Sequence, residues 1–507
     1  MANPLYDALF AHHEGKSTPF LELADTSIIT HGAFLGRAAQ YANLLESLSA
    51  TVGDRVAVQV EKSPDGLALY AACVMAGMVF LPLNPAYTAE EVAYFIEDSG
   101  ARVVVCEGRK EAELATITTR MGATLTTMNA DGTGSLQTQA AGLPTAFMPV
   151  DCAPDDLVGL LYTSGTTGRS KGAMLTHENL ISNANVLARE WKFTANDILL
   201  HALPIFHTHG LFVAVNVSLI AGGRMIFLHK FDLDAVIERL PQATTMMGVP
   251  TFYTRLLGDP RFTKDLAPQM RLHISGSAPL LADTHVAFED RTGHRILERY
   301  GMTETNMNTT NPYDGERRAG TVGKPLPGVE VKITDPKTGQ TLPSGEIGGI
   351  EVRGPNVFKG YWNIPEKTAE ELRNDGFFIT GDLGQIDADG YLHIVGRNKD
   401  LIISGGYNIY PKEIELVLDE QDGVLESAVI GLPHSDFGET AIGVLVAKKG
   451  STPDLDIIAQ NIRKSLARFK LPQRLVLLPE LPRNAMGKIQ KNELRQLFKN
   501  LLNEPRD

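Results

Sequence analysis

The sequence predicts an α/β fold, with a large N-terminal domain of mixed sheets with helical cover and a small C-terminal domain. Short β-branched runs alternate with helical patterns through the first four-fifths of the chain, which is typical of sheets covered by helices. Near residue 397 the pattern changes to a charged turn, a short apolar run, a glycine pair and a new helix start after Pro411. The chain has 507 residues, 43% of them hydrophobic, so it can bury a sizeable core.

The elements of the N-terminal domain follow from hydrophobic periodicity and β-branched composition. We expect buried strands at DRVAVQV (54–60), ARVVVCE (101–107) and LVGLLYTSG (157–165), helices at Thr88–Gly100 and at residues 177–191, and a loop or strand-poor connection at residues 129–154.

One run, Gly66–Leu83, carries no charged residue over 18 positions, a length at the edge of that of a membrane-spanning helix. It is rich in alanine and glycine, and Pro82 lies near its end. We therefore expect a buried helix that stops near Gly77, followed by a short buried strand, MVFLPL, and no membrane partner.

The cysteines and the N-terminus indicate the compartment. Cys73, Cys106 and Cys152 are far apart and form no disulfide or metal-binding pattern. The N-terminal segment, MANPLYDALF, has no basic stretch followed by an apolar one, so we expect no signal peptide. These features suit a reducing compartment, and we expect a cytoplasmic protein.

The charge distribution limits the partners. A net charge of −13 disfavours general binding to nucleic acid or anionic membranes. An anionic ligand would have to be held by local cations and backbone N–H groups. Residues 463–499 are strongly basic, with Glu480 and Glu493 as their only acids. This segment is either a solvated face that balances charge or a cap that brings cations to a phosphate-rich ligand.

The stretch TSGTTGRSKG (163–172) has the composition of a phosphate-binding loop. Backbone N–H groups of such a loop can hold oxyanions, and Lys171 adds a point charge. A Walker A loop is excluded, because the sixth position from Gly165 is Ser170 rather than glycine. A P-loop NTPase is therefore disfavoured, although the loop alone could also be an ordinary polar connection.

Several further motifs accompany this loop in a fixed order. They are YTSGTTGRSKGAMLTH (162–177), LPIFHTHG (203–210), SGSAPL (275–280), YGMTET (300–305), TGDLG (380–384), GRNKDLIISGGYNIYP (396–411) and PRNAMGKI (482–489). The set closely resembles the adenylate-forming acyl-CoA synthetase family, from about residue 20 to residue 499. The resemblance implies transfer of AMP from ATP to a carboxylate, followed by attack of the CoA thiol. It also implies a mobile α+β C-terminal domain.

The resemblance assigns most nucleotide contacts to the N-terminal domain. The triphosphate would lie against Thr163, Ser164, Gly165, Thr166, Thr167, Gly168 and Lys171, and the adenine and α-phosphate against Ser277, Ala278, Tyr300, Gly301 and Thr303. Glu304, with Thr166 nearby, would hold Mg²⁺, a hard cation that prefers oxygen ligands.

The other nucleotide contacts implied by the resemblance lie toward the C-terminus. Asp382 would accept hydrogen bonds from the ribose hydroxyls, and Arg397 would contact ribose and phosphate. Lys488 would reach the α-phosphate and the attacking carboxylate oxygen. Acetylation would remove the charge of Lys488, so a lysine acetyltransferase and a deacetylase are possible partners.

A change of domain orientation would separate the two half-reactions. By the same resemblance, the N-terminal domain spans residues 1–396, the hinge 397–400 and the cap domain 401–507, with Lys399 as the hinge residue. Rotation would bring Gly405, Gly406 and Tyr407 to line the CoA tunnel, where glycines allow close backbone approach.

The acyl group is indicated by histidines and arginines. His207 and His209 could form a metal pair, but no third ligand is evident. The family carries a similar histidine motif beside its acyl pocket, so His207 is expected to contact or gate the acyl group. Arg299, directly before Tyr300, resembles the arginine of malonyl-CoA synthetases, and Arg255 is a second candidate. Arginine can hold the free carboxylate of a dicarboxylate by two hydrogen bonds.

The sequence therefore predicts a malonyl-CoA synthetase that uses ATP, CoA and Mg²⁺, with methylmalonate as a possible second substrate. The alternatives are a short-chain or aryl acyl-CoA synthetase, an adenylation enzyme that loads a carrier protein, and a nucleotide-binding protein without enzymatic activity. Each differs in an observable way: preference for a monocarboxylate, use of a holo-carrier in place of free CoA, or no release of AMP.

Overall fold

The computed structural model describes residues 2–163, 170–404, 407–434, 437–484 and 487–503. Their contacts divide the chain into two compact units. Unit 1 is Met1–Glu330 with Val352–Phe378, and unit 2 is Val331–Glu351 with Ile379–Asp507. The predicted hinge at residues 397–400 lies inside unit 2, and its role in domain motion stays a prediction.

The first sheet of unit 1 carries the predicted phosphate loop at its edge. Its described strands follow the order β6 (Thr124–Thr127), β5 (Val103–Cys106), β3 (Arg55–Gln59), β4 (Val79–Pro82), β7 (Leu157–Thr163) and β8 (Lys171–Thr176). Neighbours are parallel except for the β7–β8 hairpin. The strands predicted at residues 54–60, 101–107 and 157–165 are thus confirmed, and the alternate residues Val104 and Cys106 of β5 pack against α4 and α5.

The second sheet of unit 1 carries several residues of the predicted site, among them Arg299 on β13. Its described strands follow the order β15 (Lys324–Pro325), β14 (Asn306–Thr310), β13 (Leu297–Met302), β12 (Leu272–Ser275), β11 (Thr245–Gly248), β9 (Ile198–His201), β10 (Arg224–Phe227), β1 (Pro19–Glu22) and β2 (Ile28–Thr30). From β1 to β13 the neighbours are parallel. The loops after these strands therefore emerge at one edge of the sheet, where ligands bind in α/β folds.

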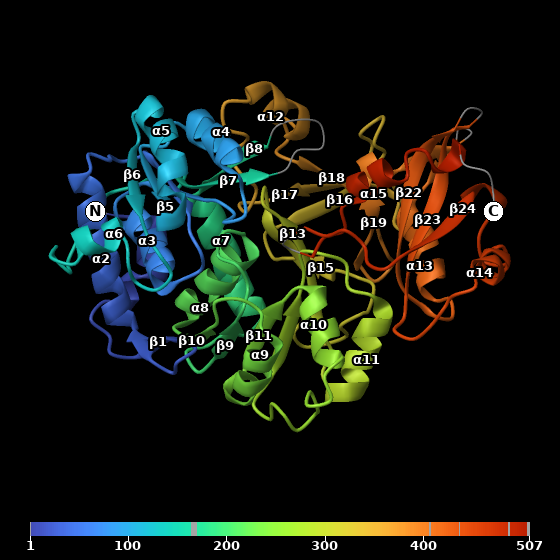
Figure 1. Cartoon of the computed structure of the whole chain (residues 1–507), viewed down its shortest axis with the longest axis horizontal. Coiled ribbons are helices and arrows are strands. Elements are labelled where there is room, and N and C mark those ends of the chain that lie inside the picture. Colours follow the sequence, from blue (N-terminus) through green and yellow to red (C-terminus); the bar gives the residue numbers. More distant parts are fainter. Residues whose placement is uncertain (1, 164–169, 405–406, 435–436, 485–486, 504–507) are drawn as a thin grey trace. The chain divides into compact units, whose positions relative to one another are not determined.

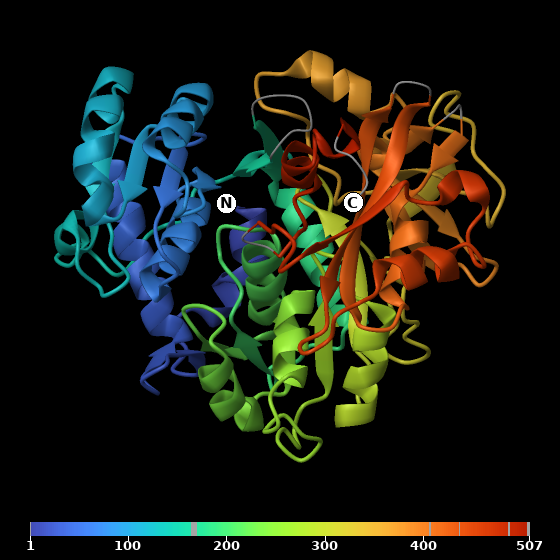
Figure 2. The same cartoon turned by 45° about the vertical axis from the view of Figure 1, so that its right-hand side comes forward.

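Helices cover both sheets of unit 1 (Figure 1). They are α1 (Pro4–Leu9), α2 (His31–Ser47), α3 (Pro64–Met75), α4 (Ala89–Ser99), α5 (Glu111–Met121), α6 (Ser135–Ala140), α7 (His177–Glu190), α8 (Asn216–Ala221), α9 (Leu233–Arg239), α10 (Pro250–Leu257), α11 (Ala282–Thr292) and α12 (Pro365–Glu371). Figure 2 shows the blue and cyan elements on the left and green helices in the lower middle. The predicted α4 and α7 are confirmed, and both begin at a threonine that forms a capping box. The predicted strand-poor connection at 129–154, all of it within the described residues, contains the short helix α6 and no strand.

The uncharged run Gly66–Leu83 folds as predicted. Its helix, α3, ends at Met75, Gly77 has a positive φ of 65°, and the chain continues into buried β4. Glycine adopts this left-handed conformation without the steric cost of a Cβ atom. Among the described residues, every helix is too short or too polar to cross a lipid bilayer.

Unit 2 contains two sheets and a few short helices. One sheet has the order β16 (Glu330–Thr334), β17 (Gly348–Arg353), β18 (Phe378–Ile386) and β19 (Leu392–Arg397), and the other has β21 (Tyr407–Ile409), β20 (Ile402–Ser404), β23 (Gly438–Ala447) and β22 (Val424–His434), with β24 (Arg474–Leu478) beside β23. The helices are α13 (Pro411–Asp419), α14 (Leu455–Ile462) and α15 (Lys491–Leu497). The predicted strand, turn and helix start around Pro411 are present, and α13 and α14 pack on the second sheet in one apolar cluster.

Candidate active site

The β7–β8 hairpin holds the two ends of the predicted phosphate loop together. Thr163 ends β7 and lies opposite Lys171, the first residue of β8. The residues between them that were predicted to bind phosphate lie outside the described residues: Ser164, Gly165, Thr166, Thr167 and Gly168. An antiparallel pair of this kind holds the last residue of β7 and the first residue of β8 opposite each other.

Beside this hairpin, a tyrosine joins two carboxylates. The Tyr361 hydroxyl lies 2.7 Å from Glu371 Oε2 and 3.1 Å from Glu304 Oε1. Lys171 Nζ is 3.3 Å from Glu371 Oε1 and 4.1 Å from the centre of the Tyr361 ring. Burial and the negative charge of Glu304 raise the pKa of Tyr361, so its hydroxyl remains a donor. The sequence offered no motif for Tyr361 or Glu371.

Glu304, the predicted Mg²⁺ ligand, is buried at the same place. Thr163 Oγ1 donates to Glu304 Oε1 over 3.4 Å, and only 5% of the Glu304 surface is exposed. A buried carboxylate beside Thr163, where β7 ends, offers the oxygen ligands that a hard cation prefers. Thr166, the other predicted ligand, lies outside the described residues. Within the described ranges, no group of three His, Cys, Asp or Glu side chains could hold a metal ion by itself.

Arg299, on β13, is a buried cation without a counterion. It is 3% exposed, and its Nε and Nη2 atoms have no hydrogen-bond partner among the described residues. Burial lowers its pKa to about 9. Its guanidinium lies against the backbone of Gly276, where a Cβ atom would be 2.4 Å from Arg299 Cζ. A buried, unpaired cation is costly, so this position favours an anionic ligand.

His209, rather than His207, is the histidine that faces this cation. His209 Nδ1 lies 3.2 Å from Ser277 Oγ, and its buried Nε2 has no partner among the described residues. Burial and the nearby charge of Arg299 lower the pKa of His209 well below its ordinary value. His207 is half-buried, and burial lowers its pKa to about 4. Both imidazoles are therefore neutral near pH 7, which argues against either acting as a cation.

Arg255 lies away from Arg299. It is exposed on α10, with its guanidinium carbon 6.0 Å from the centre of the Phe231 ring. Tyr253, two residues earlier on α10, is fully buried, and the charge of Arg299 influences its pKa. Residues two positions apart on a helix do not share a face, so α10 turns Tyr253 toward Arg299 and Arg255 away. The role predicted for Arg255 stays a prediction that this geometry does not favour.

The predicted adenine and α-phosphate residues lie at the same sheet edge. Ser277 and Ala278 follow β12, whereas Tyr300, Gly301 and Thr303 lie at the end of the neighbouring parallel strand β13 and in its turn. Ser277 has a positive φ of 71°. At Gly301 a Cβ atom would be 1.8 Å from the Asn306 carbonyl oxygen, so this turn requires glycine.

In unit 2, the charges of the predicted ribose-binding residues, Asp382 and Arg397, influence the pKa of the predicted catalytic residue, Lys488. Arg397 Nε lies 2.8 Å from Asp382 Oδ1, and the two residues pair across β18 and β19. Lys488 as a whole is exposed. The pKa of its ammonium group is nevertheless lowered to about 8, mainly by desolvation and to a lesser extent by the positive charge of Arg397. Burial also lowers the pKa of Lys399, the predicted hinge residue.

The predicted CoA segment is described only in part. Gly405 and Gly406 lie outside the described residues, whereas Tyr407 is exposed and stacks on Phe469 with ring centres 4.7 Å apart. The structure thus gives Tyr407 a partner that the sequence did not indicate.

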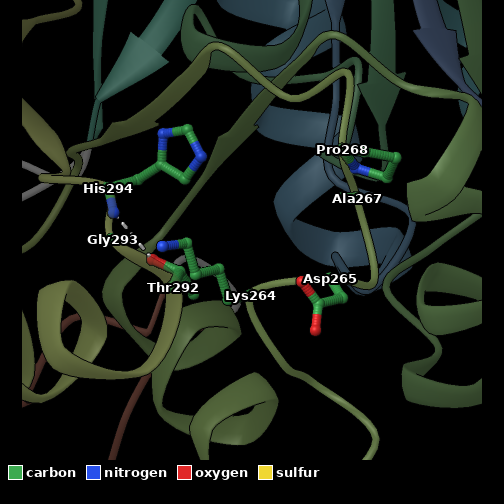
Figure 3. A pocket seen from close by; sticks show the side chains of 7 residues that line it. All are labelled: Lys264, Asp265, Ala267, Pro268, Thr292, Gly293 and His294. Carbon is green, nitrogen blue, oxygen red and sulfur yellow. Dashed lines mark hydrogen bonds between the residues drawn. The ribbon is translucent and has the colours of Figure 1, made fainter.

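A surface pocket of about 430 Å³ lies elsewhere on unit 1 (Figure 3). It is lined by Lys264, Asp265, Ala267, Pro268, Thr292, Gly293 and His294. The His294 backbone N–H donates to Thr292 Oγ1 over 3.1 Å, which closes the turn after α11. None of the predicted site residues lines this pocket, and the chemistry at Arg299 and Glu304 is the stronger indicator of the site.

Two protein-family models match most of the chain. Residues 11–362 match the AMP-binding enzyme family, and residues 413–488 match the AMP-binding enzyme C-terminal domain. The chain belongs to the AMP-binding enzyme family. The predicted adenylate-forming family and the predicted fold class are therefore confirmed.

Several relatives resemble this AMP-binding enzyme along most of its length. Malonate–CoA ligase of Arabidopsis thaliana is 34% identical over 97% of the chain and 87% of the relative. A feruloyl-CoA synthase of an Amycolatopsis species is 37% identical over 93% and 94%. The crystal structure of ATP-bound MatB from Rhodopseudomonas palustris is 55% identical, covers 99% of this chain and 100% of that chain, and has a TM-score of 0.97.

We expect Gly276→Ala to displace the Arg299 guanidinium and to lower the free energy of unfolding by about 1–3 kcal/mol, the usual cost of overpacking. The cost should shrink in an Arg299→Ala background, because the clashing atoms are then absent. Urea unfolding of the two single variants and the double variant measures both effects.

The matched control is Gly258→Ala at the end of α10, where the nearest atom to a Cβ would be 3.4 Å away. It should change the free energy of unfolding by no more than about 0.5 kcal/mol. An equal cost of Gly276→Ala with and without Arg299 would contradict the packing described here.

Proposed function

We propose that this AMP-binding enzyme is a cytoplasmic malonyl-CoA synthetase, which converts malonate, ATP and CoA into malonyl-CoA, AMP and pyrophosphate. The observation that carries the proposal is the buried Arg299, whose Nε and Nη2 atoms have no hydrogen-bond partner among the described residues. The 34% identity to a malonate–CoA ligase over nearly the whole chain supports it. The feruloyl-CoA synthase among the relatives represents the main alternative, a ligase for aryl acids.

Arg299 recognises the carboxylate that does not react. Malonate carries two carboxylates near pH 7: one becomes the anhydride, and the other accepts hydrogen bonds from Arg299 Nε and Nη2. A carboxylate matches the planar guanidinium and forms charge-assisted hydrogen bonds. Acetate, fatty acids and aryl monocarboxylates would leave the buried cation unpaired, so they bind poorly. Methylmalonate keeps both carboxylates, and a single methyl group is hard to exclude by packing.

The first half-reaction joins malonate to AMP. A malonate oxygen forms a bond to the α-phosphorus of ATP while the bond to pyrophosphate breaks. Thr163, Lys171 and the loop between them hold the β- and γ-phosphates, and Ser277, Ala278, Tyr300, Gly301 and Thr303 hold adenine and the α-phosphate. Asp382 and Arg397 orient the ribose. Lys488 brings positive charge to the α-phosphate, where two anions must approach each other.

Mg²⁺, when bound, neutralises part of the triphosphate charge. Glu304 and Thr166 would hold it. The Tyr361 hydroxyl and Thr163 Oγ1 both lie within hydrogen-bond distance of Glu304 Oε1, at 3.1 and 3.4 Å, and they restrict where that carboxylate points. Glu371 holds Lys171 as its counterion, so the lysine exchanges one anionic partner for another when the nucleotide enters.

The second half-reaction releases AMP. The CoA thiolate attacks the acyl carbonyl, and the bond between that carbon and the AMP oxygen breaks. Residues 397–400 act as the hinge, with Lys399 at its centre, and Gly405, Gly406 and Tyr407 line the path of the pantetheine arm. His207 gates the acyl group, and burial lowers its pKa to about 4, so the ring is neutral near pH 7.

The proposed function is tested by CoA-dependent AMP release with malonate, methylmalonate, acetate, octanoate and benzoate. Wild-type enzyme should prefer malonate. Arg299→Ala should lower kcat/KM for malonate by about 100-fold or more, because removing one member of a buried charge pair costs about 2–5 kcal/mol. The preference for malonate over acetate should disappear with it.

Arg255→Ala separates the two arginines in the same assay. The exposed position of Arg255 predicts a change in kcat/KM of less than about threefold, within the range of surface substitutions. A wild-type preference for benzoate or octanoate would replace the proposal with an aryl or fatty acyl-CoA synthetase. Activity with a holo-carrier alone would point to an adenylation enzyme, and no AMP release to a binding protein.

The charge of Lys488 predicts a pH profile. Its pKa is lowered to about 8, so the ammonium is present below that pH and is lost as the pH rises through it. The ratio kcat/KM for ATP, which reports on groups of the free enzyme, should therefore fall above about pH 8. Pyrophosphate exchange at saturating malonate measures it without CoA.

Lys488→Gln serves as the control and as a mimic of acetylation by a lysine acetyltransferase. It should be slow at every pH in pyrophosphate exchange, yet should still convert supplied malonyl-adenylate and CoA into malonyl-CoA. The role of this charge would be contradicted if wild-type kcat/KM for ATP stayed constant up to pH 9.5, or if Lys488→Gln catalysed pyrophosphate exchange as fast as wild type. Removal of the acetyl group from an acetylated enzyme should restore pyrophosphate exchange.

A further inference from the structure

Lys62 is a buried lysine without an acidic partner. It lies between β3 and α3 and is 6% exposed. Its Nζ atom lies 2.7 Å from His201 Nδ1, 2.8 Å from the His201 carbonyl oxygen and 4.2 Å from the centre of the Phe227 ring. Among the described residues, no carboxylate forms an ion pair with Lys62. A lysine is rarely buried in this way, so its two hydrogen bonds call for an explanation.

His201 connects Lys62 to the loop of residues 203–210, called the histidine loop below. His201 is the last residue of β9, and its Nε2 lies 2.8 Å from the Gly210 carbonyl oxygen. A carbonyl can only accept, so Nε2 carries the proton and Nδ1 accepts from Lys62. Burial lowers the pKa of His201 well below its ordinary value, which agrees with a neutral ring that has one donor and one acceptor.

Gly210 belongs to the segment that carries His209. A π-helix runs through His209–Val215, an uncommon conformation that occurs mostly at functional sites. At Gly210 a Cβ atom would lie 2.0 Å from the Pro204 carbonyl oxygen, so the loop of residues 203–210 folds tightly back on itself. His209 in turn lies 3.2 Å from Ser277 Oγ and beside the charge of Arg299.

We propose that Lys62 is a positioning residue of the acyl pocket. Through His201 it fixes the Gly210 carbonyl and thereby the placement of the His209 imidazole next to Arg299. The inference rests on the proposed role of Arg299 in holding the acyl substrate. It extends that role to a side chain on the other sheet of unit 1, since Lys62 follows a strand of the first sheet and His201 ends a strand of the second.

A purely structural role would have a different signature. The backbone of Lys62 also joins the two sheets, because the His229 ring lies with Nδ1 2.9 Å from the Lys62 carbonyl oxygen. This contact does not involve the Lys62 side chain, so it survives substitution of that side chain. Loss of the ammonium group therefore isolates the link through His201 to the histidine loop.

The test is Lys62→Met, which keeps the length of the side chain but cannot donate to His201. We expect its KM for malonate to rise by about tenfold or more, as when a buried polar contact loses its partner, with the KM for ATP within about twofold of wild type. Pyrophosphate exchange measures both constants. If Lys62→Met does not fold, His201→Phe breaks the same link by removing the donor to Gly210, and it should give the same split.

The matched control is Arg239→Met, which removes another buried cation from unit 1. Arg239, on α9, is 5% exposed and pairs with Glu22 on β1. This variant should lower the melting temperature and leave both KM values within about twofold of wild type, because the Arg239 side chain pairs with Glu22 and not with the Lys62–His201–Gly210 chain.

The outcomes separate this inference from the proposed function. A wild-type enzyme that prefers another acid contradicts malonate as substrate, and the KM split is then measured with the preferred acid. Equal KM increases for acid and ATP in Lys62→Met, or no change in either, overturn the positioning role. A further check is the double variant Lys62→Met, His201→Phe, which should be no worse than either single variant if the residues act in one chain.

Discussion

The uncompensated charge of Arg299 is the constraint around which the acyl side of the site is organised. The guanidinium is nearly inaccessible and lies against Gly276, and its neighbour His209 is a neutral imidazole. Nothing among the described residues neutralises it, and burial has already lowered its pKa to about 9. A protein retains such a cation at a cost in stability, and the cost is understandable where a ligand supplies the missing anion. In the proposed function, the same residue binds the second carboxylate of a dicarboxylate and disfavours monocarboxylates.

The nucleotide side meets the opposite problem, an excess of negative charge. The Tyr361 hydroxyl lies within hydrogen-bond distance of both Glu304 and Glu371, and Lys171 is paired with Glu371. The two sides share one scaffold, because the loops after β12 and β13 emerge at one edge of a parallel sheet. Ser277 connects the two sides. It belongs to the predicted nucleotide-binding segment, and its hydroxyl lies within hydrogen-bond distance of His209.

The sequence predicted the family, the fold class and the main strands, because ordered motifs and hydrophobic periodicity are local properties. It also singled out Arg299 as a candidate for substrate binding, since the residue lies directly before the motif YGMTET, and that role stays a prediction. Two kinds of information were out of reach. The preference for His209 over His207 and for Arg299 over Arg255 depends on which way each side chain turns and how deeply it is buried, and residue type alone does not reveal either. Tyr361, Glu371 and Lys62 act through contacts with residues more than 50 positions away along the chain, and no spacing in the sequence connects them.

The most direct measurement of the central claim is a crystal structure of the enzyme with malonate and a non-reactive ATP analogue. The account predicts that one carboxylate accepts hydrogen bonds from Arg299 Nε and Nη2 at about 2.7–2.9 Å, the range of charge-assisted bonds, while the other carboxylate faces the α-phosphate. Malonate bound with both carboxylates away from Arg299, and a guanidinium still unpaired beside Gly276, would contradict it.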